Sequence, residues 1–194
     1  MKKIGSGAEA TIYLDKNIIK DRTKKNYRIK ELDDFLRNSR TKREAKVLEK
    51  LQKINFNSPK IIKVENNTLE MEHIKGDQVK TILEKDPKIA KKIGNTLAKM
   101  HDHDIIHGDL TTSNMILNNK EIYFIDFGLS FFSKRIEDKA VDIHLFKQSL
   151  ESKHYKIFKK AYTEFLSGYN PKDREDILKR LSEVEMRGRY KEKT

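Results

Sequence analysis

The fold is decided by residues 105–128, which read I-I-H-G-D-L-T-T-S-N-M-I-L-N-N-K-E-I-Y-F-I-D-F-G. Two short apolar runs in this stretch, 115–117 and 122–125, flank the polar tract 118–121. Apolar runs of this length on either side of turn-forming residues are typical of a tight β-hairpin. Because a hairpin returns the chain to its starting point, the sequence predicts that the polar residues before and after it lie together.

Three such polar residues flank the predicted hairpin. Asp109 and Asn114 precede it, and Asp126 follows it in the string D-F-G. Metal-assisted phosphoryl transfer needs this set of groups, because Mg²⁺ must clamp the triphosphate while another group positions the attacking oxygen. In this interpretation Asp126 ligates the metal, Asn114 offers it a neutral oxygen, and Asp109 accepts or orients the proton of the nucleophile. The string D-F-G by itself would also fit a hairpin with a turn aspartate.

The order and spacing of these residues resemble the protein-kinase-like superfamily. The resemblance implies ATP and Mg²⁺ as cofactors and an α+β fold of minimal bilobal kinase type. Its N-lobe would be an antiparallel β-sheet with one long helix, and its C-lobe would be small and mostly helical. We expect the N-lobe at 1–73, the C-lobe at 74–185 and a basic mobile tail at 186–194.

The first segment, residues 2–21, alternates short apolar pieces with turn residues, which predicts three small antiparallel strands. Glycines in the first turn would let backbone N–H groups approach phosphate oxygens without obstruction by a Cβ atom. Lys20 stands at the position of the kinase lysine that binds the α- and β-phosphates. The third glycine of the kinase pattern is replaced by Ala10. By the same resemblance the residues covering the phosphates are Gly5, Ser6, Gly7, Ala8 and Glu9.

A long helix is predicted over residues 27–55, which contain no proline or glycine and have apolar residues at helical spacing, with a break or kink at Ser39. Glu44 projects from the apolar face of this helix, so its carboxylate needs a partner. Lys20 would give the lysine–glutamate pair of kinases. The alternative is a surface pair with Arg40, one helical turn earlier.

Two more strands, 61–65 and 69–72, are predicted on either side of an Asn-Asn turn. The residues that follow resemble the kinase hinge. The resemblance implies that backbone groups of Glu72 and Ile74 hydrogen-bond adenine. A plain strand end is the alternative.

Helical periodicity returns after Pro87, over 136–150 and in two amphipathic segments near the C-terminus. Asp142 lies on the second of these helices, where an acidic residue braces the catalytic loop of kinases. The histidines His101, His103 and His107 could hold a metal, but they lead into the catalytic loop and are interpreted as structural.

Charge points to an anionic partner. Lys and Arg number 42 against 30 Asp and Glu, which gives a net charge of +12. The stretch 22–53 holds 12 basic and 5 acidic residues. A polyanion could lie along this stretch, and a solvated helix face is the equal alternative.

The chain has no cysteine, which excludes disulfides and Cys-ligated zinc. No apolar run approaches the roughly 20 residues of a membrane span, and the first residues lack the apolar core of a signal peptide. We therefore expect a cytoplasmic protein without a membrane partner.

Two features narrow the resemblance, and three segments specify it further. H-G-D at 107–109 is typical of the atypical RIO kinases and of small-molecule phosphotransferases, and no A-P-E string closes an activation segment. The chain is most similar to the family of small kinase-like ATPase subunits of KEOPS (EKC) complexes. The segments that carry this similarity are Arg37 to Ala45, Ile136 to Ile143 and Arg187 to Arg189.

This resemblance implies a kinase-like ATPase, or atypical serine/threonine kinase, that acts in the threonylcarbamoyl-adenosine modification of tRNA. It also implies a threonylcarbamoyl-transferase subunit and a small regulatory subunit as partners, with tRNA bound through the complex. The acceptor of the phosphoryl group is either water or a protein hydroxyl. Two alternatives are a free-standing RIO-like or small-molecule phosphotransferase and a catalytically silent nucleic-acid-binding scaffold.

Overall fold

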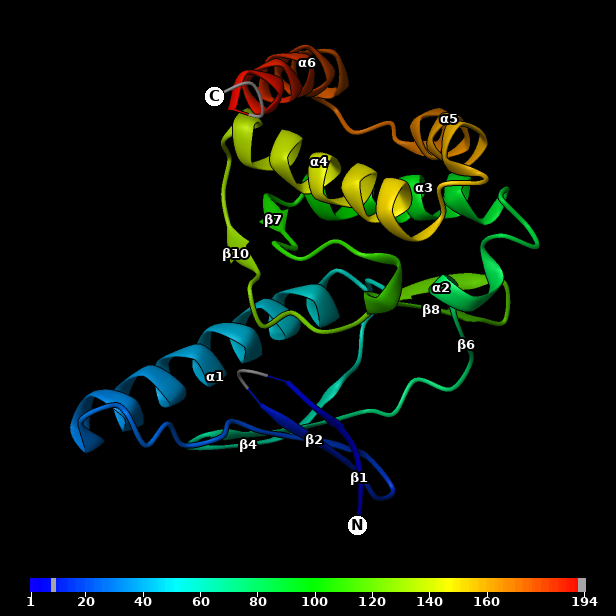
Figure 1. Cartoon of the computed structure of the whole chain (residues 1–194). Helices are drawn as coiled ribbons and strands as arrows, with labels where there is room; N and C mark the ends of the chain where they lie inside the picture. Colours follow the sequence, from blue (N-terminus) through cyan, green and yellow to red (C-terminus); the bar gives the residue numbers. More distant parts are fainter. Residues whose placement is uncertain (8–9, 192–194) are drawn as a thin grey trace.

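The computed structural model describes residues 1–7 and 10–191, with side chains as far as Met186. Its first part is a five-stranded sheet with the strand order β1-β2-β3-β5-β4, in which all neighbours are antiparallel (Figure 1). The three strands expected within 2–21 are present. The five strands are β1 (Lys2–Ser6), β2 (Thr11–Leu14), β3 (Ile18–Asp21), β4 (Ile61–Glu65) and β5 (Thr68–Met71).

A single long helix, α1 (Lys30–Lys53), packs against β4 and β5. Its C-terminal half buries Val47, Leu48 and Leu51, which recur at helical spacing on one face. The helix continues through Ser39, so the predicted break there is wrong. A serine inside a helix costs less than about 0.7 kcal/mol relative to alanine, and the good helix formers around it outweigh that cost.

The second part of the molecule contains the predicted hairpin and most of the helices. A three-stranded sheet has the order β6-β8-β9, and a two-stranded sheet pairs β10 with β7. The strands are β6 (Asp77–Gln78), β7 (Ile105–Ile106), β8 (Met115–Asn118), β9 (Glu121–Phe124) and β10 (Phe131–Phe132). The helices are α2 (Val79–Ile82), α3 (Ile89–His101), the 3₁₀ turn Thr112–Asn114, α4 (Ile136–Lys153), α5 (Phe158–Gly168) and α6 (Arg174–Lys191).

The predicted tail does not begin at Met186 as a separate segment, because α6 continues as a helix to Lys191. Its last residues contain Gly188, which costs about 1 kcal/mol in a helix, but they lack proline, and the Met, Arg and Lys residues around this glycine are good helix formers. Residues 192–194 lie outside the described residues.

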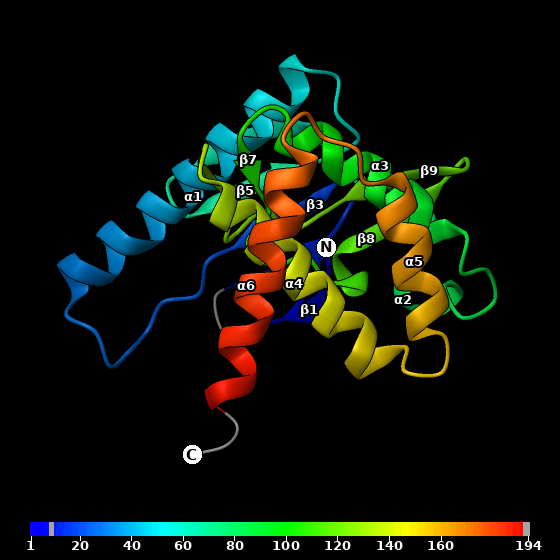
Figure 2. The ribbon, with the colours of Figure 1, turned by 90° about the horizontal axis from the view of Figure 1, so that it is seen from above.

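The apolar core is continuous from the sheet-facing side of α1 to the helices, and it includes the hairpin residues Met115, Ile122 and Phe124. Viewed from above, α4 lies between α6 and α5, and α3 lies beneath α5 (Figure 2). Within the described part of the chain, no helix is both long and apolar enough to cross a bilayer. The predicted α+β fold class, with an antiparallel sheet, a long helix and a mostly helical second part, is confirmed.

Helices α3 and α5 approach each other so closely that glycine is required on both. A Cβ atom on Gly94 would lie 2.2 Å from the carbonyl oxygen of Phe165. A Cβ atom on Gly168 would lie 2.0 Å from the carbonyl oxygen of Lys91. Both contacts are with backbone atoms, which cannot turn aside as a side chain would.

We therefore expect Gly94→Ala to lower the free energy of unfolding by about 1–3 kcal/mol, the usual cost of overpacking. Urea unfolding at neutral pH would measure the loss. Gly5→Ala is the matched control, because its new Cβ would meet Ile12 at 3.7 Å, an ordinary contact distance. Equal stability of the Gly94 variant and the control would contradict the close approach of α3 and α5.

Candidate active site

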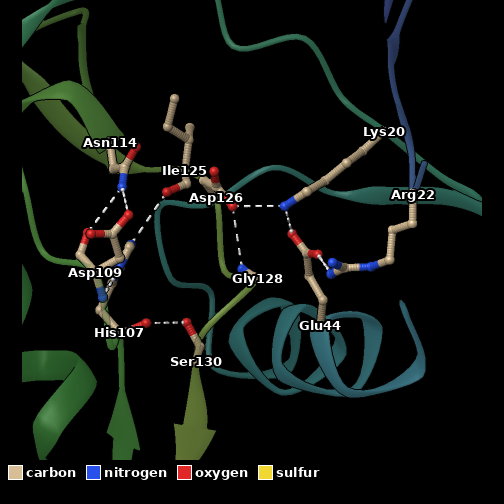
Figure 3. Close-up of polar contacts among 10 residues, drawn as sticks. All are labelled: Lys20, Arg22, Glu44, His107, Asp109, Asn114, Ile125, Asp126, Gly128 and Ser130. Atoms are coloured by element: carbon tan, nitrogen blue, oxygen red, sulfur yellow. Dashed lines mark hydrogen bonds and ion pairs between the residues drawn. The ribbon is translucent and has the colours of Figure 1, made fainter. Parts of the chain in front are cut away.

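Four charged side chains form one cluster, Lys20 of β3, Arg22 just after it, Glu44 of α1 and Asp126 after β9 (Figure 3). The Lys20 Nζ atom of β3 lies 2.7 Å from Glu44 Oε1 of α1 and 2.7 Å from Asp126 Oδ1. The Arg22 NH2 atom lies 2.6 Å from Glu44 Oε2. Lys20, Arg22 and Glu44 are buried, whereas half of the Asp126 side chain is exposed. Lys20 is thus the partner of Glu44, as in the first of the two alternatives considered for that residue.

Arg22 is a member of this cluster that the sequence interpretation missed. Strand geometry gives the signal that could have found it, because residues two apart on a strand point to the same side. Arg22 follows Lys20 by two, so both reach the same carboxylate. The Glu44 carboxylate therefore forms ion pairs with two cationic side chains, Lys20 and Arg22.

Both ends of the Lys20–Asp126 pair are charged at neutral pH. Burial alone would lower the pKa of Lys20, but the carboxylates of Glu44 and Asp126 outweigh it, and the pKa is raised. Burial alone would raise the pKa of Asp126, but the charge and hydrogen bond of Lys20 outweigh it, and that pKa is lowered. The ion pair therefore persists over the whole neutral range.

The two other predicted catalytic-loop residues lie together. Asn114 Nδ2 donates to Asp109 Oδ2 and to the Asp109 carbonyl oxygen, both at 2.9 Å. The Ile125 N–H donates to the Asn114 carbonyl at 2.9 Å, which fixes the loop to the residue before Asp126. Asp126 itself has a φ of 63°. A non-glycine residue in this left-handed region is strained, and such strain gathers at functional sites.

Asp142 of α4 holds the beginning of the catalytic loop, as the sequence predicted. Its Oδ2 atom accepts from the His107 N–H at 2.7 Å, and its Oδ1 atom accepts from the Gly108 N–H at 2.9 Å. His101 Nε2 lies 3.3 Å from Asp142 Oδ2. Gly108 has a φ of 79°, and a Cβ there would lie 2.5 Å from the Leu129 carbonyl oxygen. The H-G-D string therefore needs its glycine for conformation and for space.

Two of the three clustered histidines serve this framework. His101 Nδ1 hydrogen-bonds the Tyr169 hydroxyl at 2.7 Å, and His107 Nε2 hydrogen-bonds the Ile125 carbonyl at 3.2 Å. Burial lowers the pKa of His107, so its ring is neutral at neutral pH. Within residues 1–7 and 10–191, no group of three or more His, Cys, Asp or Glu side chains is placed to hold a metal ion.

The pKa of Asp142 gives a pH-dependent prediction. Burial alone would raise it, but the hydrogen bond and charge interaction with His101 and the His107 N–H outweigh burial, so the pKa is lowered. A carboxyl with a lowered pKa stabilises the fold above its unfolded value of about 3.9 and loses that contribution as the pH falls through the folded value.

We expect Asp142→Asn to have a lower free energy of unfolding than the wild type at neutral pH, with a gap that narrows as the solution falls below about pH 4. Urea unfolding over a series of pH values would measure it. Asp15→Asn, at an exposed carboxylate, is the control. A gap that stays constant with pH would show that the charge of Asp142 does not carry this interaction.

Two cavities adjoin the charged cluster. The larger, of about 580 Å³, lies between the sheet and the hairpin. The smaller, of about 270 Å³, is reached by Asp109, Asp126 and Arg40. The residues around the larger cavity include Ile12, Ile18, Lys20, Met71, Glu72, Ile74, Asn114, Ile116 and Asp126.

The predicted hinge lies on the wall of the larger cavity. Ile74 is buried, and the Glu72 N–H donates to the Lys60 carbonyl at 2.8 Å. A ligand would therefore use the Glu72 carbonyl rather than its N–H.

Of the five residues predicted to cover the phosphates, the structure places one, Gly7, at a cavity next to the charged cluster. Gly7 reaches the smaller cavity, and its N–H donates to the Ala10 carbonyl at 2.9 Å. Gly5 and Ser6 belong to β1 and line neither cavity. Ala8 and Glu9 lie outside the described residues.

Comparison with known proteins gives a consistent result. The model of the RIO domain matches residues 13–135. The KEOPS complex subunit Bud32 of Pyrococcus abyssi is 43% identical over 100% of this chain and 98% of its own length. A probable serine/threonine-protein kinase, the BUD32 homolog of Archaeoglobus fulgidus, is 39% identical over 98% of this chain and 97% of its own.

A third relative is longer. The probable bifunctional tRNA threonylcarbamoyladenosine biosynthesis protein of Methanocaldococcus jannaschii is 44% identical over 97% of this chain, which spans 37% of that protein. Among solved structures, the Rio2 kinase of Chaetomium thermophilum in an ADP/Mg²⁺-phosphoaspartate complex superposes with a TM-score of 0.64 at 16% identity. The match covers 98% of this chain and 70% of that one, and it shows a shared fold. By its domain match and its full-length relatives, the protein belongs to the RIO-domain family, together with the subunits named Bud32.

Proposed function

We propose that this chain is a Mg²⁺-dependent ATP phosphotransferase and ATPase of the atypical serine/threonine kinase type, acting as a KEOPS subunit in the threonylcarbamoyl-adenosine modification of tRNA. The observation that carries the enzymatic part is the buried Lys20–Glu44 pair, joined to Asp126 at the wall of the larger cavity. A silent scaffold would gain little from burying three charges at this place, because a buried ion pair is seldom worth more than apolar packing.

The larger cavity suits a nucleotide. Its volume of about 580 Å³ lies within the range of roughly 300–1,000 Å³ that small-molecule sites occupy. Apolar side chains such as Ile18, Met71 and Ile116 would cover a base, and the Glu72 carbonyl and the Ile74 N–H would hydrogen-bond its edge. Lys20 would then bind the phosphates at the opposite end. Gly7, which reaches the smaller cavity, would cover them. The same role stays a prediction for Gly5, Ser6, Ala8 and Glu9.

The residues at the phosphate end also suit a magnesium ion. Asp126 binds Lys20 and the Gly128 N–H through Oδ1, so Oδ2 would serve a metal. Asn114 donates its Nδ2 to Asp109, so its amide oxygen is turned to the other side. When bound, Mg²⁺ supplies charge neutralisation of the phosphates. Asp109 would orient the nucleophile and accept its proton, held in place by Asn114 and by the loop anchored on Asp142.

The biological part of the proposal comes from the relatives. One is named as a KEOPS subunit, and another as a threonylcarbamoyladenosine biosynthesis protein. We propose that this chain has the same two roles, as a KEOPS subunit and in threonylcarbamoyladenosine synthesis. Its partners would be a threonylcarbamoyl-transferase subunit and a small regulatory subunit, with tRNA bound through the complex. We further propose that the lobes divide at residue 73, between β5 and β6. The cytoplasmic location expected from the sequence stays a prediction.

For Asp109→Asn we expect ATP affinity within a few fold of wild type and a turnover number lowered by at least about 10²-fold, the usual range for a removed acid–base group. Calorimetric titration with ATP would measure the affinity, and single-turnover hydrolysis would measure the rate of the chemical step. Asp15→Asn, in the exposed β2–β3 turn, is the control. An equal loss of affinity and turnover would make Asp109 a binding residue and remove its catalytic role.

For Asp126→Asn we expect ATP turnover to lose its dependence on Mg²⁺ concentration together with nearly all of its rate, because the amide is a poor metal ligand. The measurement is the initial rate across a Mg²⁺ titration at fixed ATP. A variant with the wild-type rate and the wild-type half-saturating Mg²⁺ concentration would refute the metal site.

A further inference from the structure

Arg40 differs from the basic residues that follow it on α1. It stands four residues before Glu44, and residues at this spacing lie on the same side of a helix. That side faces the charged cluster, because Glu44 binds Lys20 and Arg22 there. Arg40 is partly buried and lines the smaller cavity. The basic residues next along the helix are exposed, namely Lys42, Arg43 and Lys46.

The two cavities beside the cluster share one wall and differ in the rest of their lining. Lys20 and Asp126 line both cavities. Asp109 and Arg40, by contrast, line only the smaller one. A nucleotide in the larger cavity would direct its phosphates to Lys20, and the nucleophile would approach from the smaller cavity, where Asp109 accepts its proton. Arg40 therefore lies on the acceptor side of the group that is transferred.

The smaller cavity suits an anion of the size of phosphate. The charged side chains that line it comprise three cations and two carboxylates, namely Lys20, Arg22 and Arg40 against Asp109 and Asp126. Its volume of about 270 Å³ falls just below the roughly 300 Å³ at which sites for whole small molecules begin. A cavity of this size and charge accepts a phosphate group together with a water molecule or a single hydroxyl group.

Arg40 adds a cation of a different kind from the other two. Lys20 and Arg22 both bind the Glu44 carboxylate, at 2.7 and 2.6 Å, and Lys20 also binds Asp126. Their charges are therefore balanced within the cluster. Arg40 reaches the cavity from one helical turn before Glu44, and its guanidinium has the planar fork that donates two parallel hydrogen bonds to phosphate oxygens.

The fold also fixes the part of α1 that carries Arg40. The next residue, Thr41, is buried, and its hydroxyl donates to the Arg37 carbonyl at 3.0 Å. Ala45 is buried as well, beside the Glu44 carboxylate that ties the helix to Lys20. A donor held in place before the reaction stabilises developing charge without the cost of reorganisation.

We propose that Arg40 is a catalytic residue that binds the phosphoryl group during its transfer, and that the smaller cavity then holds the orthophosphate product. The inference rests on the proposed function. With water as the acceptor, a bond forms between the water oxygen and the γ-phosphorus, and the bond from that phosphorus to the β,γ-bridging oxygen breaks. The electron pair of the broken bond leaves with ADP. The water proton passes to Asp109, which releases it to solvent.

The test compares Arg40→Met with Arg43→Met. Both changes remove one positive charge from α1 and introduce a good helix former, but Arg43 is exposed and lines neither cavity. The first probe is ADP with Mg²⁺, titrated by calorimetry with and without aluminium fluoride, which mimics the phosphoryl group in transfer. The second is orthophosphate, measured by equilibrium dialysis against the ADP-bound protein. ATP turnover is measured in parallel.

We expect Arg40→Met to keep its affinity for ADP within about 3-fold. Its affinity for ADP with aluminium fluoride and its turnover number should both fall by at least about 10²-fold, the usual effect of removing one donor to developing charge. Orthophosphate affinity should fall as well. Arg43→Met should match the wild type in every measurement. Arg40→Lys keeps the charge but not the fork, so we expect a smaller loss with aluminium fluoride and an unchanged affinity for ADP.

Three results would overturn the proposal: an equal loss of affinity for ADP with and without aluminium fluoride, unchanged binding of aluminium fluoride and orthophosphate in Arg40→Met, or the same losses in Arg43→Met. The first would make Arg40 an ordinary binding or structural residue. Absence of ATP turnover in the wild type would defeat the proposed function. Orthophosphate binding to the ADP-bound wild type and Arg40 variants would still decide whether Arg40 forms an anion site.

Discussion

The bonding of Glu44 to both Lys20 and Arg22 is the interaction on which the rest of the structure depends. One fully buried carboxylate joins α1 to the end of β3, and Lys20 extends the cluster to Asp126 after the hairpin. Removing one partner from a buried ion pair typically costs about 3–5 kcal/mol, because the remaining charge stays desolvated. The cluster therefore ties the sheet, the helix and the D-F-G string to one another at the wall of the larger cavity, which Lys20 and Asp126 line.

A second framework supports the catalytic loop from the other side. Asp142 binds the loop at His107 and Gly108, and Ser149 accepts from the Thr112 N–H at 3.3 Å. Helix α4 therefore fixes both ends of the segment that carries Asp109. The chain after D-F-G is short, and β10 pairs directly with β7 before α4 begins. The segment between D-F-G and α4 therefore forms no extended platform for a peptide. If the proposed function holds, the phosphoryl acceptor is water or a group presented by a partner.

The sequence predicted the parts of this arrangement that follow from local periodicity. The hairpin and the long helix follow from spacing, and the need of Glu44 for a partner follows from its place on an apolar face. That this partner is Lys20 rather than Arg40 came from the resemblance to kinases. The kink at Ser39 was wrong because a single weak helix former does not outweigh its neighbours. Arg22 was missed although its place two residues after Lys20 was a usable signal, because it lies just beyond β3 and the strand pattern was not extended to it. The exposure of Ile29 and Leu32 at the beginning of α1 could not be foreseen either, since apolar residues at helical spacing normally indicate a buried face.

The most direct test of the central cluster is a double-mutant cycle on kcat/KM for MgATP with Lys20→Met and Glu44→Gln. If Glu44 acts by holding Lys20, each single change lowers kcat/KM, and the double variant loses scarcely more than the more damaging single one. Losses that multiply as independent effects would show that Lys20 and Glu44 do not act as a unit. Wild-type kcat/KM in either single variant would contradict the role assigned to the cluster.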